Sequence, residues 1–103
     1  MINSVVLMGR LTRTPECRST ENGTAVTAFR IAVDRRFTSA DGEQITDFFN
    51  IVAWRSTAVF VADHFSQGDM IAVRGALQSR QYTDKNGNNR TAIEVVADEI
   101  SFC

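Results

Sequence analysis

The sequence predicts an all-β fold, a small barrel of strands that carries one helix, and three observations indicate it. Most of the chain alternates apolar and polar residues with the two-residue period of a half-buried strand. Residues 56–65 instead have the spacing of a helix. Turn-forming pairs such as Asn-Gly and Asp-Gly separate the alternating segments. With 103 residues, 44% of them apolar and 22% charged, we expect one folded domain over residues 1–103.

Three strands are expected before the helix. Residues 4–11 are rich in β-forming side chains around Gly9, and Pro15 ends this first strand. Residues 24–33 follow a Glu-Asn-Gly turn and form the second strand. Residues 47–55, with the sequence DFFNIVAWR, form the third strand after a polar loop that contains an Asp-Gly pair.

The helix is predicted from one apolar stripe, with Ser56 or Thr57 as its N-cap and Gly68 closing its end. The stripe consists of Ala58, Val61, Ala62 and Phe65. Strands over residues 70–83 and 91–102 follow, joined by a hairpin turn at residues 84–89. The side chains expected to face inward in these two strands are Ile71, Val73, Leu77, Ile93 and Val95.

Three strands, one helix and two more strands is the layout of the OB-fold, a five-stranded Greek-key barrel with one α-helix between strands 3 and 4. Gly9 and Gly75 suit the bends of such a barrel. Closure of the barrel also removes sheet edges that would otherwise invite aggregation.

Two adjacent phenylalanines in the third strand indicate that one face of this strand has a role other than packing the core. Successive strand side chains point to opposite faces, so Phe48 and Phe49 cannot both enter one core. Phe49, Ile51 and Ala53 share one parity and belong to the interior or to a seam between subunits. The opposite parity carries Phe48, Asn50, Val52 and Trp54. The residues expected to join that outer face are Arg74, Arg80 and Tyr82 of the fourth strand, with Arg35, Arg36 and Phe37 where the second strand enters its loop.

Aromatic rings interleaved with arginines suit an unpaired nucleic acid strand, because every base has a π-face and every linkage a phosphate. The net charge of -1 gives no sign of such a partner, although ten of the eleven basic residues are arginine. Taken singly, Phe48 is better explained by packing, and Arg74 and Arg80 are better explained as solvated or ion-paired surface residues. Trp54 and Tyr82 are explained equally well by packing and by binding. Their shared parity favours the binding face. Arg30 also lies opposite the buried parity of its strand, whereas Phe60 is assigned to a partner surface or to partial burial.

Catalysis and cofactors are not expected. His64 is the only histidine and Asp63 points away from it around the helix, so neither a catalytic triad nor a histidine-rich metal site can be assembled. Cys17 and Cys103 are interpreted as reduced thiols. The sequence contains no phosphate-binding glycine loop, signal peptide or membrane span, and we expect a cytoplasmic protein.

The chain resembles the bacterial single-stranded DNA-binding proteins over nearly its whole length. The resemblance lies in five stretches in order: VVLMGRLTRTPE, GTAVTAFRIAVDRRF, DFFNIVAWR, QGDMIAVRGALQSRQYTD and EVVADEISF. It implies base stacking on Phe37, Phe48, Trp54 and Tyr82, and a basic path along Arg35, Arg36, Arg74 and Arg80. Many members have Gly-Lys after the position of Trp54. Arg55-Ser56 stands there in this chain, so the basic contact is assigned to Arg55.

The resemblance further implies a homotetramer built from dimers, in which the first strand, with Val6 and Met8, pairs with its copy. The implied function is sequence-independent binding of single-stranded DNA in replication, recombination and repair, in the bacterial nucleoid. Family members recruit replication and repair proteins through an acidic tail that this sequence, ending at Cys103, does not include. We expect either a trimmed DNA-binding domain, with those partners if the full-length chain has the tail, or a short variant that binds DNA without them. Two alternatives stay open: a tail-less primosome-type adaptor that contacts proteins through Phe60, and an RNA-binding OB module.

Overall fold

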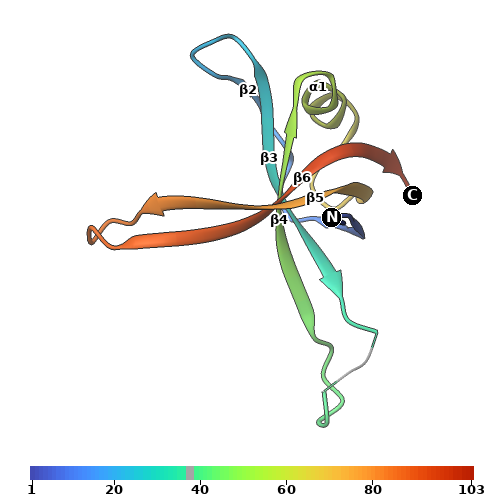
Figure 1. Cartoon of the computed structure of the whole chain (residues 1–103). Helices are drawn as coiled ribbons and strands as arrows, with labels where there is room; N and C mark the ends of the chain where they lie inside the picture. Colours follow the sequence, from blue (N-terminus) through green and yellow to red (C-terminus); the bar gives the residue numbers. More distant parts are fainter. Residues whose placement is uncertain (37–38) are drawn as a thin grey trace.

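A computed structural model describes residues 1–36 and 39–103. It contains six strands and one helix: β1 (Val5–Leu11), β2 (Cys17–Ser19), β3 (Ala25–Asp34), β4 (Thr46–Trp54), α1 (Arg55–His64), β5 (Met70–Thr83) and β6 (Asn89–Phe102) (Figure 1). The five expected strands and the helix are all present, with bounds within two residues of the prediction. β2 was not predicted, because its three residues are all exposed and pair with β3 alone.

The strands close into the ring expected of an OB-fold. Their order is β1-β5-β6-β4-β3, and β1 closes the ring through Arg10 and Leu11, which pair with Ala32 and Ile31 of β3. Neighbouring strands are antiparallel except β4 and β6, which run parallel over a short stretch. The helix lies between β4 and β5, as predicted. Within the described ranges, no helix is long and apolar enough to cross a membrane.

The core fills the barrel and the space beneath α1. Ile31, Ile51, Ile71 and Val95 are fully or almost fully buried and come from four different strands of the ring. The helix contributes Ala58 and Val61, and Phe65 follows it, which confirms most of the predicted stripe. Thr27 of β3 is buried as well, and its hydroxyl donates a hydrogen bond of 2.9 Å to the carbonyl of Ala58.

Gly9 and Gly75 lie where strands approach each other too closely for a side chain. A Cβ on Gly9 would come within 2.7 Å of the carbonyl oxygen of Ala32. A Cβ on Gly75 would overlap the carbonyl oxygen of Val96, next to the register shift between β5 and β6. The predicted bends are therefore explained by close backbone approach and not by positive φ angles.

Three details of the prediction were wrong. Leu77 and Ile93 are 44% and 57% exposed, because they lie in the β5–β6 arm, residues 77–94, which extends beyond the barrel (Figure 1). Helix α1 begins at Arg55 directly after β4 and has no side-chain cap, so neither Ser56 nor Thr57 caps it. The helix ends at His64, and Gly68 instead adopts a φ of 89° in the turn that follows.

Candidate nucleic-acid interface

The outer side of β4 carries the aromatic rings that the alternation predicted. Phe48 is 51% exposed and Trp54 is 41% exposed, whereas Ile51 and Ala53 of the other parity are fully buried. The alternation follows from the pleat, since β4 pairs with β3 along its whole length without a bulge. The two rings are therefore held on a rigid strand and directed away from the core.

The register extends this surface across four strands. Asn50 pairs with Arg30 of β3, and Val52 pairs with Val96 of β6. Side chains at paired positions lie on the same face of a sheet, so the outer side of β4 continues through β3 and β6 to β5. We call this surface the outer face. Its members are Val26, Ala28, Arg30 and Ala32 of β3, Phe48, Asn50, Val52 and Trp54 of β4, Arg90, Ala92, Glu94 and Val96 of β6, and Ala76, Gln78, Arg80 and Tyr82 of β5.

Two grooves run along the outer face. The first has a volume of about 760 Å³ and lies between the segment 12–18 and the sheet. Four guanidinium side chains line it, from Arg13, Arg18, Arg30 and Arg80. The second groove, of about 550 Å³, is lined by Trp54, Arg55, Gln78 and Val96 and by the loop at residues 20–24.

Two arginines of the outer face lie over aromatic rings. The Cζ atom of Arg30 is 4.5 Å from the ring centroid of Phe48, and that of Arg80 is 5.5 Å from the ring centroid of Tyr82. Arg80 also forms an ion pair with Glu94 at 3.4 Å. The sequence placed Arg30 on the outer side of its strand, but the contact with Phe48 depends on the β3–β4 register, which the sequence pattern does not specify.

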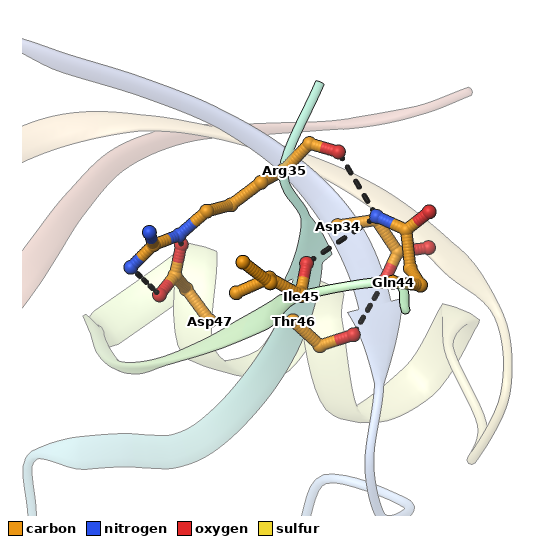
Figure 2. A network of polar contacts seen from close by, with 6 residues as sticks. All are labelled: Asp34, Arg35, Gln44, Ile45, Thr46 and Asp47. Atoms are coloured by element: carbon orange, nitrogen blue, oxygen red, sulfur yellow. Dashed lines mark hydrogen bonds and ion pairs between the residues drawn. The ribbon is translucent and has the colours of Figure 1, made fainter. Parts of the chain in front are cut away.

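Arg35 is held within the β3–β4 hairpin (Figure 2). Its guanidinium donates to both carboxylate oxygens of Asp47, at 2.8 and 3.0 Å. The Gln44 amide donates to the carbonyl oxygens of Arg35 and Ile45, and the Thr46 hydroxyl donates to Asp34 at 2.7 Å. The hydrogen bond from Arg35 lowers the pKa of Asp47, and the same contact raises the pKa of Arg35.

The remaining predicted site residues fall in different places. Arg55, with a φ of 60°, is exposed beside Trp54 in the second groove. Arg74 lies opposite Val6 of β1 and is held by Asp98 at 3.2 Å and Glu99 at 2.7 Å, and it lines neither groove. Arg36 is exposed in the loop after β3, and Phe37 lies outside the described residues.

The structure therefore brings part of the predicted set together. The members on or beside the outer face are Phe48, Trp54, Tyr82, Arg55 and Arg80. Arg13, Arg18 and Arg30 line the same surface and were not assigned to the site from the sequence. Arg13 and Arg18 could not be found from strand parity, because Arg13 lies in a loop and Arg18 in the short strand β2.

Phe60 is half-buried within the protein, which agrees with the partial burial considered for it. Its ring stacks on His64 at 4.6 Å between centroids and meets Phe102 edge-on at 5.6 Å. Phe65 stacks on Phe102 at 4.9 Å between centroids and meets Phe60 edge-on at 6.0 Å. The aromatic cluster thus attaches the end of β6 to the helix.

The geometry agrees with comparisons to known proteins. The family described as "Single-strand binding protein family" matches residues 2–103. The "Single-stranded DNA-binding protein 2" of Staphylococcus aureus strain Mu50 is 46% identical over 99% of this chain and 72% of its own length. The "Single-stranded DNA-binding protein" of Caldanaerobacter subterraneus subsp. tengcongensis is 43% identical over 99% of this chain and 68% of its own length. The chain belongs to the single-strand binding protein family.

Proposed function

We propose that this protein binds single-stranded DNA without reading its sequence. Bases would stack on Phe48, Trp54 and Tyr82 while guanidinium groups contact the phosphates. The observation that carries the proposal is the continuity of the outer face, on which three exposed rings and several arginines lie across paired strands. The names of the relatives, which are single-stranded DNA-binding proteins, support this choice of ligand.

Stacking and phosphate contacts would both contribute to the affinity for a single strand. Stacking contributes roughly 1–3 kcal/mol per base, so three rings would contribute about 3–9 kcal/mol before the cost of ordering the strand. Five engaged arginines would give a slope of log K against log[salt] of about -3.5 per subunit, since each single-strand phosphate contributes about -0.7. The five arginines counted here are those that line the two grooves, namely Arg13, Arg18, Arg30, Arg55 and Arg80.

Titration with oligo-dT tests the proposal directly. Trp54 is the only tryptophan, so quenching of its fluorescence reports on stacking at the outer face. Duplex DNA should bind much more weakly, because paired bases cannot reach the rings. A wild-type protein that neither quenches nor shows an anisotropy change with labelled oligo-dT at low salt would overturn the proposed function. Competition with oligo-U distinguishes DNA binding from the RNA-binding alternative.

We further propose the assembly and role expected of the family. β1 exposes Val6 and Met8 at 73% and 57%, and along residues 5–8 its edge opposite β5 pairs with no strand of the described residues. Such an edge is a template for strand addition by a second copy, which supports a dimer and from it a tetramer. Protection of single strands in replication, recombination and repair is the proposed cellular role. The protein-adaptor alternative has less support, because Phe60 is covered in part by His64 and Phe102.

A further inference from the structure

We propose that Arg30 is a displaceable cover on Phe48. In the unbound protein its guanidinium occupies the position over the ring that a stacking base requires. On binding, the base displaces the guanidinium, which then contacts a phosphate in the groove beside it. This inference rests on the proposed binding of single-stranded DNA and deepens it. It proposes that Arg30 contacts the Phe48 ring in the free protein and a phosphate in the complex.

The geometry makes the two occupants mutually exclusive. The Cζ atom of Arg30 lies 4.5 Å from the centroid of Phe48, which is the separation of an aromatic ring from a stacked neighbour. A base that stacks on this side of Phe48 must enter the same volume. The guanidinium therefore has to leave before the base can make full contact.

The sequence explains why this arginine reaches this ring. Phe48 pairs directly with Ala32, whose side chain is a single methyl group and is too short to cover the ring. Arg30 pairs with Asn50, the next residue of the same parity on β4, so it is the diagonal neighbour of Phe48. A long side chain spans such a diagonal, and a cation over an aromatic face is weakly favourable at an exposed site.

Arg30 is also free to move. Arg35, Arg74 and Arg80 are each held by a carboxylate, whereas within residues 1–36 and 39–103 Arg30 forms no ion pair. Its side chain lines the 760 Å³ groove together with Arg13 and Arg18, so a released guanidinium enters a basic surface next to the ring. There it can donate to a phosphate of the strand whose base has taken its place.

The exchange predicts a distinctive salt dependence. Arg30→Ala loses one phosphate contact, so the slope of log K against log[salt] becomes shallower by about 0.7. At high salt the phosphate contact contributes little. The variant then binds oligo-dT more tightly than wild type, because no guanidinium has to be displaced from the Phe48 ring. The gain expected from an exposed cation–π contact is about two- to five-fold in affinity. The lines for wild type and variant should therefore cross, with the variant weaker at low salt and tighter near 1 M.

The experiment measures oligo-dT binding by Trp54 fluorescence for wild type, Arg30→Ala and Arg18→Ala between about 0.05 and about 1 M NaCl. Arg18 is the matched control, since it lines the same groove and pairs with the carboxylate of Glu16 and not with a ring. Arg18→Ala should give no gain at high salt. Parallel plots of log K against log[salt] for wild type and Arg30→Ala would overturn the proposal that Arg30 covers Phe48. An equal gain in affinity at high salt for both variants would overturn it as well.

A second pair of variants ties the effect to the ring. In a Phe48→Leu background, adding Arg30→Ala should no longer raise the affinity at high salt, because there is no ring left to uncover. A gain that persists without Phe48 rejects the proposal. Circular dichroism melts establish that each variant is folded. A wild-type protein that does not bind oligo-dT would refute the proposed function itself. A wild-type protein that binds, but whose salt-dependence line does not cross that of Arg30→Ala, would refute only the role proposed for Arg30.

Discussion

At the scale of single residues, the number of arginines available to DNA depends on which of them already pair with carboxylates. Arg35 is held by both oxygens of Asp47, and Arg74 is held by Asp98 and Glu99. A guanidinium in a bidentate pair has to lose that partner before it can contact a phosphate. The count of arginines in a sequence therefore overestimates the number available to DNA.

This argument predicts the effect of Asp47→Asn. Removal of the carboxylate should release Arg35, raise affinity for oligo-dT at low salt and steepen the slope of log K against log[salt] by up to about 0.7. Asp34→Asn is the matched control, because Asp34 lies in the same hairpin and accepts from the Thr46 hydroxyl. Both variants remove one negative charge. Equal gains in the two would assign the effect to net charge and would contradict a specific release of Arg35.

A second residue-scale prediction concerns acid stability. The pKa of Asp84 lies below its ordinary 3.8, chiefly through the hydrogen bond from Arg90 and also through the backbone N–H groups of Asn88 and Asn86. A carboxyl with a depressed folded pKa stabilises the fold above its unfolded pKa, and this contribution is lost as pH falls through the folded value. Asp84→Asn should therefore flatten the fall of Tm with pH below about 4. Thermal melts across that range check it, and parallel curves for the two proteins would contradict it.

At the scale of elements, the β5–β6 arm shows where strand parity stops being informative. Leu77 and Ile93 have the alternation of buried residues, but both lie beyond the barrel and are exposed. Parity tells which side of a strand a residue occupies. It does not tell how far along the strand the barrel still covers that side, because the covering residues belong to distant parts of the sequence.

Gly75 provides the prediction at this scale. A Cβ there would overlap the backbone of Val96, at the bulge that separates barrel from arm, and backbone cannot move aside as a side chain can. Gly75→Ala should lower the free energy of unfolding by about 3 kcal/mol or more. Gly23→Ala is the comparison, because Gly23 has a φ of 81° but open space around it, and its cost should be about 1–2 kcal/mol. Urea denaturation measures both, and an equal loss would reject the overlap as the cause.

At the scale of the whole molecule, the OB-fold could be predicted because each strand and the helix has its own periodicity and its own turn signals. β2 could not, since three exposed residues have no pattern of burial to detect. In the candidate site, the outward orientation of Phe48 and Trp54 could be predicted from the alternation of residues along one strand. Arg30 could also be placed on the outer side of its strand, but its contact with Phe48 and the positions of Arg13 and Arg18 depend on how strands and loops lie beside each other, which no local sequence pattern specifies. Phe37 stays a prediction, because it lies outside the described residues.

The last prediction concerns how whole molecules associate through β1. If two copies pair along residues 5–8, Val6 and Met8 of each are removed from water, and burial of a side chain of this size contributes roughly 1.5–3 kcal/mol. Val6→Glu would place like charges near the twofold axis and should shift the protein toward a monomer in sedimentation equilibrium. Val59→Glu, on the exposed side of α1, makes the same substitution away from β1 and should leave the mass unchanged.

The fluorescence of Trp54 in the monomeric variant should still be quenched when oligo-dT binds, because the rings of β4 lie on the outer face of each subunit. A wild-type mass of one chain, or a Val6→Glu mass equal to that of a wild-type oligomer, would show that β1 is not the joining strand.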